Sequence, residues 1–260
     1  AYVKLWKHHA AQAQAEQLTR LLAERDPDRL ARYGGLVSSE WQFPKALQLL
    51  TEDPEIYARA DHLVEANDWI VWQLGGRLTR NACTVGYKGL HQDGSYPDPD
   101  VLGALNPDFA TVAHDLLSGP VVQLGERAGA LTAEAAAWTG LPEGIAVAAG
   151  NVDAHVTAPA ADAVQPGQMT LIMGTSTCHI LSDHTLHVVP GMCGVVDGGI
   201  VAGLQGYEAG QSGVGDIFAW FVTNAVPAAY RDEAERRGLS PHELLTEKAA
   251  RQAIGQHGLL

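Results

Sequence analysis

The sequence predicts an α/β protein of two domains, in which mostly helical segments precede a group of short strands. The helical period is clearest over residues 10–26, where leucines recur on one face. A short apolar run at 144–151 ends in glycine and asparagine, as expected of a buried strand that leads into a turn. The Ala-, Pro- and Gly-rich segment 158–168 separates this run from three further strand-like runs. We therefore expect one domain over residues 1–163 and a second over residues 164–260.

The first domain is expected to open with the helix at 10–26, which the glycine pair of the segment RYGG ends. Residues 38–76 predict two or three short helices, with Pro44 and Pro54 near helix starts, where proline is tolerated. A second glycine pair closes the last of these helices. The small residues of the segment RNACTVGYKG, 80–89, indicate a buried turn beside a cleft, and the composition of HQDGSYPDPD indicates a loop.

Near the domain boundary, Thr132 is expected to cap a short helix that Gly140 ends. The second domain is expected to open with three strands, at residues 169–174, 178–182 and 199–204. An amphipathic helix follows at 240–256. The chain starts without a methionine and stops directly after this helix, so we expect it to be an internal part of a longer protein, with both domains incomplete.

Charge and composition exclude some function classes. A formal net charge of -13 argues against a binder of the nucleic-acid backbone, which needs a positive face. It does not exclude a nucleotide substrate, because backbone N–H groups can hold its phosphates. No apolar run reaches membrane-spanning length. The three cysteines, Cys83, Cys178 and Cys193, show no disulfide-framework spacing and favour a reduced, cytoplasmic setting.

Two segments carry candidate chemistry. Asp153 follows the predicted strand in a turn opened by Gly150, a position where α/β folds place catalytic groups. An Asx turn or a helix cap explains the aspartate equally simply, and on this residue alone it is the favoured interpretation. Further on, Gly174, Thr175 and Ser176 follow a strand and could hold phosphate oxygens with their N–H groups and hydroxyls. An ordinary hairpin turn has the same composition, and the Gly-Lys pair of a phosphate-binding P-loop is absent.

Two further residues are ambiguous on the sequence alone. Glu208 lies among glycines and Lys88 among small residues, and either side chain could be solvated. The histidines show no zinc-enzyme spacing, so no metal ligands are expected among them. His155 and Cys178 adjoin the candidate segments and are expected to shape a cleft.

The ordered combination of segments is more specific than any of them alone. It resembles the FGGY family of carbohydrate kinases, and within it the ribulokinase branch, over nearly the whole chain. The segments that carry the resemblance are LWKHHAAQ, RYGGLVSSEWQFPKALQLL, RNACTVGYKG, GNVDAHVTAPAA, MTLIMGTSTCH, VPGMCGVV and GYEAGQSGVGDIFAWF.

The resemblance implies a two-domain actin-like, ribonuclease-H-like ATPase fold with ATP and sugar bound between the domains. Residues 1–163 would then belong to the N-terminal, sugar-binding domain and 164–260 to the C-terminal, ATP-binding domain. By resemblance, Asp153 matches the catalytic base, and Lys88 and Glu208 match sugar-contacting positions. Three residues match the second phosphate loop, namely Gly174, Thr175 and Ser176.

The implied reaction is the phosphorylation of L-ribulose to L-ribulose 5-phosphate by ATP and Mg²⁺, in cytoplasmic L-arabinose catabolism. A homodimer is also expected. The family's first phosphate loop, Asp-x-Gly-Thr, and its adenosine-binding segment have no match in this sequence. We therefore expect the 260-residue chain by itself to be inactive.

Other functions compete with this interpretation. The chain could come from another kinase of the same family, acting on D-ribulose or a polyol. It could also be a non-catalytic sugar-binding module on the same fold, although sugar binding alone does not require the retained Asp153. A hydrolase is disfavoured because residues 210–214 fail the G-x-S-x-G pattern.

Overall fold

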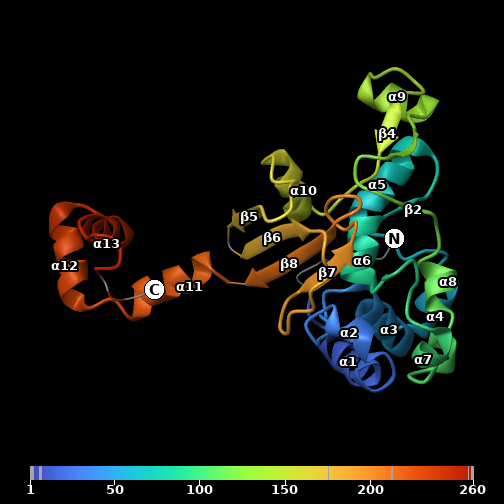
Figure 1. Ribbon diagram of the computed structural model, residues 1–260, viewed down its shortest axis with the longest axis horizontal. Helices are drawn as coiled ribbons and strands as arrows, with labels where there is room; N and C mark the ends of the chain where they lie inside the picture. The colour runs from blue at the N-terminus through green and yellow to red at the C-terminus, as the bar shows by residue number, and fades with distance from the viewer. Residues whose placement is uncertain (1–2, 6–7, 175, 212, 257, 259–260) are drawn as a thin grey trace. The chain divides into compact units, whose positions relative to one another are not determined.

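The computed structural model describes residues 3–5, 8–174, 176–211, 213–256 and 258 (Figure 1). The chain forms two compact units: residues 1–172 with 178–210, and residues 173–177 with 211–260. These units do not divide at residue 163, so the domain boundary expected there stays a prediction.

The first unit contains most of the helices. Those before the first strand are α1 (Gln12–Arg25), α2 (Pro27–Ala31), α3 (Gln42–Glu52), α4 (Pro54–Arg59) and α5 (Ala66–Gly75). Those after it are α6 (Ala82–Gly89), α7 (Pro99–Gly103), the 3₁₀ helix η1 (Pro107–Phe109), α8 (Val112–Leu116), α9 (Ala133–Thr139) and α10 (Asp153–Ala160). The second unit contains α11 (Gly215–Asn224), α12 (Ala228–Arg237) and α13 (Pro241–Ala250).

Eight strands form three sheets among the described residues. The two small sheets pair β1 (Arg80–Asn81) with β2 (Val121–Val122) and β3 (Arg127–Ala130) with β4 (Ala146–Ala148). The largest sheet has the order β5-β6-β8-β7, with the strands β5 (Met169–Met173), β6 (Thr177–Asp183), β7 (Gly194–Asp197) and β8 (Gln205–Gln211). Strands β7 and β8 are antiparallel, and Gly194 pairs with Glu208.

The helical layer has its own hydrophobic core. The apolar face predicted at 10–26 becomes α1, and its Leu18 and Leu22 are fully buried against α3. Phe43 of α3 meets Phe109 edge to face, with ring centroids 6.2 Å apart. Each such buried side chain contributes roughly 1.5–3 kcal/mol relative to the exposed state.

Several helix ends agree with the sequence prediction. Thr132 caps α9 by accepting a hydrogen bond from the Ala135 N–H, and Gly140 ends the helix in the left-handed region. Gly76 ends α5 in the same way. At the start of α13, where only a helix was predicted, Ser240 and Glu243 form a reciprocal capping box.

The segment 80–89 forms the short strand β1 and the buried helix α6, and not the turn that the sequence predicted. The cause is tertiary, because the cap that starts α6 is held from another helix. The Asn81 side chain accepts hydrogen bonds from the Thr84 N–H at 2.8 Å and the Thr84 hydroxyl at 2.7 Å. Asp68 of α5 in turn accepts from the Asn81 side-chain amide at 2.7 Å. Beside it, the buried Arg80 guanidinium donates to three backbone carbonyls, those of Leu63, Leu116 and Ser118.

Two strand predictions need correction. Residues 199–204 form no strand, because they make the turn between β7 and β8, where Gly198 and Gly203 adopt positive φ. The apolar Ile200 of this turn is fully buried and belongs to the core instead. The run at 144–151 yields the short strand β4, of which only Val147 is buried, because β4 pairs with β3 alone.

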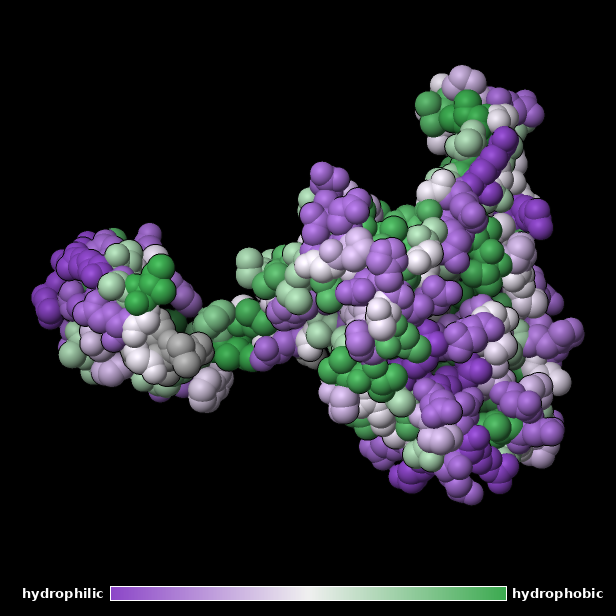
Figure 2. Space-filling model, in the orientation of Figure 1, coloured by the Kyte–Doolittle hydropathy of each residue, from purple (hydrophilic) through white to green (hydrophobic). Residues whose placement is uncertain are grey.

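The second unit consists mainly of helices. Its α12 and α13 pack together around Ala234 and Leu244, and Lys248 pairs with Glu233 at 2.9 Å. Apolar side chains of α11 lie on the surface (Figure 2), and Trp220 is 64% exposed. Among the described residues, no helix combines the length and apolarity needed to cross a bilayer.

Replacement of Asn81 tests the buried cap. Asn81→Ala is expected to lower the free energy of unfolding by about 1–2 kcal/mol, because it removes an N-cap and leaves buried donors unpaired. Urea unfolding would measure the change. Asn106→Ala is the control, because the Asn106 side chain caps the Asp108 N–H at an exposed position. This variant is expected to lose less unfolding free energy than Asn81→Ala. Equal losses in the two variants would show that the Asn81 network adds nothing.

Asp68 predicts an unusual dependence of stability on pH. Burial raises the pKa of Asp68 to about 6, although hydrogen bonds from Asn81 partly oppose the rise. The folded state therefore holds a proton that the unfolded state releases near pH 4, so stability from this group is lost as pH rises from about 4 to about 6. Asp68→Asn keeps the acceptor oxygen and removes the titration.

The measurement for Asp68 is urea unfolding of the parent and Asp68→Asn between pH 4 and pH 7. The parent is expected to lose stability relative to the variant with rising pH, by an amount on the order of 2–3 kcal/mol. Parallel curves for the two proteins would contradict the raised pKa.

Candidate active site

The candidate site is built around a buried aromatic ring on α6. Tyr87 is 1% exposed, and its ring stacks on the His155 ring of α10, with centroids 4.3 Å apart and planes inclined by 20°. Glycines of the β7–β8 hairpin surround it. A Cβ atom at Gly199 or Gly206 would come within 2.8 Å of the Tyr87 side chain, and one at Gly194 within 3.0 Å. Side chains at these positions would push α6 off the sheet.

His155 and Glu208 form a buried ion pair. The His155 Nε2 lies 3.3 Å from Oε2 of Glu208, and the two side chains are 1% and 17% exposed. The approach is close enough for an ion pair, but its angle is not that of a hydrogen bond, since neither ring nitrogen has a hydrogen-bond partner among the described residues. Glu208 therefore lies within β8 and is largely buried, whereas the sequence alone allowed a solvated turn.

The two pKa values are displaced in opposite directions. Burial by itself would lower the pKa of His155, but the Cys83 sulfur and the Glu208 carboxylate raise it to about 10. Burial by itself would raise the pKa of Glu208, but His155 and Lys88 lower it below its usual value. Each group thus favours the charged form of the other.

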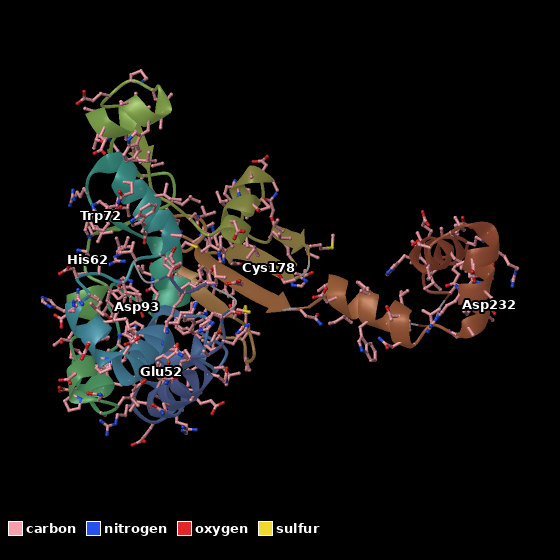
Figure 3. The ribbon with its side chains drawn as sticks, turned by 180° about the vertical axis from the view of Figure 1, so that it is seen from behind. Glu52, His62, Trp72, Asp93, Cys178 and Asp232 are labelled. Atoms are coloured by element: carbon pink, nitrogen blue, oxygen red, sulfur yellow. The ribbon has the colours of Figure 1, made fainter. Side chains whose placement is uncertain are left out.

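Cys178 is a half-buried thiol of the first unit. It lies on β6, in the largest sheet (Figure 3). Burial raises the pKa of Cys178, and the carboxylates of Glu208, Asp153 and Glu40 raise it further, whereas Lys88 opposes the rise. The candidate residues Lys88, Asp153 and Glu208 all belong to this unit, on α6, α10 and β8.

Asp153 is the first residue of α10 and is exposed. Its Oδ1 accepts a hydrogen bond from the Ala154 N–H at 2.9 Å. The N-cap of α10 is Val152, so Asp153 is not the helix cap that the simpler interpretation allowed. Its Oδ2 has no hydrogen bond to any described residue. A carboxylate in the first turn also interacts favourably with the helix dipole. Asp153 therefore combines a fixed backbone position with an oxygen that can accept a proton.

The predicted phosphate loop belongs to the second unit. Thr175 lies outside the described residues. The Gly174 N–H donates to the Ser176 carbonyl at 2.8 Å, so this amide is used within the turn. Phosphate binding by Gly174, Thr175 and Ser176 stays a prediction.

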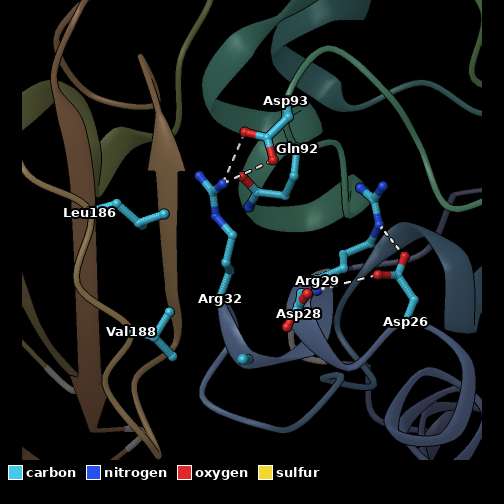
Figure 4. Close-up of a pocket in the computed structure, with 9 residues that line it drawn as sticks. Asp26, Asp28, Arg29, Arg32, Gln92, Asp93, Leu186 and Val188 are labelled. Atoms are coloured by element: carbon cyan, nitrogen blue, oxygen red, sulfur yellow. Dashed lines mark hydrogen bonds and ion pairs between the residues drawn. The ribbon is translucent and has the colours of Figure 1, made fainter.

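No metal centre is evident in the described part of the chain, where no three or more His, Cys, Asp or Glu residues cluster as metal ligands. A cavity of about 360 Å³ lies elsewhere in the first unit, between α2 and residues 186–188 (Figure 4). Its two guanidinium groups are already paired, Arg29 with Asp26 at 2.7 Å and Arg32 with Asp93 at 3.0 Å. We assign this cavity no ligand.

Sequence reasoning missed two residues of the site. Tyr87 was not singled out, and His155 was given no role beyond shaping a cleft. Their only sequence clue is proximity, since Tyr87 precedes Lys88 and His155 follows Asp153 by two positions.

Gly206→Ala tests the close packing around Tyr87. The added methyl would meet the Tyr87 hydroxyl at 2.8 Å and Ile200 at 2.9 Å, so we expect a loss of roughly 1–3 kcal/mol of unfolding free energy. Tyr87→Phe in the same chain removes the hydroxyl and should recover part of the loss. Gly75→Ala, whose new methyl meets nothing closer than 3.7 Å, is the control. Urea unfolding that shows no loss for Gly206→Ala would contradict this packing.

Comparison with known proteins supplies independent findings. Residues 169–260 match the C-terminal domain of the FGGY family of carbohydrate kinases. The chain is 62% identical over 260 residues to a ribulokinase of Mycolicibacterium smegmatis and 51% identical over 261 residues to a ribulokinase of Shouchella clausii. Both matches include the whole chain but 46% of the relative, so the chain spans about half the length of these curated relatives.

Solved structures agree in fold. A xylulose kinase from Rhodospirillum rubrum is 25% identical and superposes with a TM-score of 0.72, over 92% of this chain and 46% of that one. A xylulose kinase from Lactobacillus acidophilus is 14% identical, with a TM-score of 0.71 over 98% of this chain and 48% of that one. The second likeness bears on the fold alone.

Proposed function

The chain belongs to the FGGY family of carbohydrate kinases, with its actin-like, ribonuclease-H-like fold, and on that premise we propose that the whole protein phosphorylates L-ribulose with ATP. The product would be L-ribulose 5-phosphate, in cytoplasmic L-arabinose catabolism. The ribulokinase names of the relatives at 62% and 51% identity support ribulose as the sugar, and the family resemblance of the sequence points to its L form. The family match from residue 169 onward supports a domain boundary near residue 163.

The observation that carries the proposal is the match of the whole chain to two ribulokinases, at 62% and 51% identity. The candidate residues Lys88, Asp153 and Glu208 come from three different elements of the first unit. Their chemistry is complementary. A lysine donor and a glutamate acceptor can fix two sugar hydroxyls, which holds the reacting hydroxyl in one orientation. The exposed Asp153 can then act on that hydroxyl.

In the proposed reaction Asp153 is the general base. The terminal sugar oxygen forms a bond to the γ-phosphorus of ATP while the bond from that phosphorus to the ADP oxygen breaks. The hydroxyl proton passes to the Asp153 carboxylate as the new bond forms. Because phosphoryl transfer depends mainly on positioning and charge neutralisation, one correctly placed carboxylate is sufficient base.

Mg²⁺ would neutralise phosphate charge, as it does in kinases generally. The described residues offer no cluster of three or more metal-binding side chains that would hold the ion. The Gly174–Ser176 turn is proposed to contact ATP phosphates, which would require the Gly174 N–H to leave its present partner. A homodimer stays a prediction.

Activity is tested on a fusion protein, here called the completed protein. In it the chain replaces the matching 46% of the Mycolicibacterium smegmatis relative, and the rest of that relative is kept. ADP release with MgATP would be measured against L-ribulose, D-ribulose, D-xylulose and polyols. L-ribulose is expected to give the highest kcat/KM. Asp153→Asn is expected to reduce kcat by about 10²–10⁴, because the base is lost.

Asp162→Asn is the matched control, since Asp162 is also exposed and follows the same helix α10. Its left-handed backbone, with φ of 58°, suits asparagine equally well. It should retain full activity. An Asp153→Asn variant as active as the parent would refute the base assignment, and a preference for another sugar would refute the substrate.

A further inference from the structure

We propose that His155 is a positioning residue, which holds the Glu208 carboxylate toward the sugar through an ion pair fixed by ring stacking on Tyr87. The inference rests on the proposed function, because it assigns a task to a residue behind the sugar-contacting Glu208. His155 itself is 0% exposed, so it cannot reach a substrate and must act through a neighbour.

The geometry restrains His155 on two sides. Its ring face lies on Tyr87, with centroids 4.3 Å apart, and its Nε2 lies 3.3 Å from Oε2 of Glu208. Tyr87 cannot yield, because the glycines of the β7–β8 hairpin leave no spare space around it. The buried His155 thus restrains the Glu208 carboxylate, while the Glu208 side chain remains 17% exposed and can still meet a ligand.

A buried imidazolium requires compensation, because transfer of a charge out of water is unfavourable unless it is paired. Among the described carboxylates, Glu208 is the one at ion-pair distance from His155. Other titratable groups act on the pair from the surrounding elements. Cys83 and Tyr87 of α6 face His155. Lys88 lowers the pKa of Glu208. Glu208 in turn raises the pKa values of three groups, namely Tyr87, Cys178 and Cys193.

The same contact bears on the proposed base. His155 lies two residues after Asp153 on α10, so its stacking on Tyr87 also fixes the first turn of that helix. Loss of the charge should therefore affect mainly Glu208, whereas loss of the ring should also affect Asp153. The variants His155→Phe and His155→Gln separate these effects, because phenylalanine keeps an aromatic ring and glutamine keeps neither ring nor charge.

A titration of His155 by NMR tests the ion pair without any assay of activity. In the 260-residue chain or the completed protein, the His155 ring is expected to stay protonated at pH 8, because the Glu208 carboxylate stabilises the cation. In Glu208→Gln the carboxylate that favours the cation is lost, so the His155 pKa is expected to fall below its value in the parent. A neutral His155 at pH 7 in the parent would overturn the proposal.

Kinetics of the completed protein test the positioning role. In His155→Phe, KM for L-ribulose is expected to rise about tenfold, which corresponds to about 1.4 kcal/mol, because Glu208 loses the cation that orients it. KM for ATP should stay unchanged. The acid limb of kcat/KM for the sugar should also move to higher pH, because Glu208 loses the cation that lowers its pKa. In His155→Gln, kcat should fall as well.

His114→Gln is the control, since His114 also pairs with a carboxylate, Asp115, at 2.8 Å but is 89% exposed. It should change neither constant. Equal rises in KM for sugar and ATP, or an unmoved acid limb in His155→Phe, would show a merely structural histidine. If the parent turns over no sugar, the proposed function fails, while the NMR titration still decides whether the ion pair exists.

Discussion

The stacking of Tyr87 on His155 is the contact on which the candidate site depends. It joins three elements that are distant in sequence: α6 with Lys88, α10 with Asp153, and the β7–β8 hairpin with Glu208. The glycines of the hairpin make the contact possible, because any side chain there would displace the tyrosine. Close packing around Tyr87 therefore contributes more to the arrangement of the site than the charged contacts do.

The His155–Glu208 pair adds direction to this packing. A buried ion pair contributes little net stability, because desolvation offsets most of the attraction. Its value here lies in orientation, since a carboxylate held by a rigid cation has few alternative rotamers. Lys88 adds a second positive charge near Glu208, so the carboxylate remains ionised despite its burial. A hydroxyl-rich ligand would therefore bind to a Glu208 carboxylate that is already oriented.

Local sequence rules predicted the elements that local chemistry decides. The helix at 10–26, the Thr132 cap, the strand after residue 168 and the helix after residue 240 were predicted from period and capping. The helix α6 was not, because its cap depends on Asp68 of another helix. Residues 199–204 misled the prediction, because an apolar run can be buried in a turn as well as in a strand.

The candidate site was predictable only in part. Asp153, Lys88 and Glu208 each had a simple structural explanation, and family resemblance singled them out. The roles of Tyr87 and His155 could not be predicted, because a stack and an ion pair between distant segments leave no pattern in a single sequence.

The most direct test of this account is a crystal structure of the completed protein with L-ribulose bound. We predict that one sugar hydroxyl lies about 2.6–3.2 Å from the free Oδ2 of Asp153, with others at hydrogen-bond distance from Lys88 and Glu208. His155 should remain stacked on Tyr87 and out of contact with the sugar. A sugar bound away from these three side chains, or in direct contact with His155, would contradict the account.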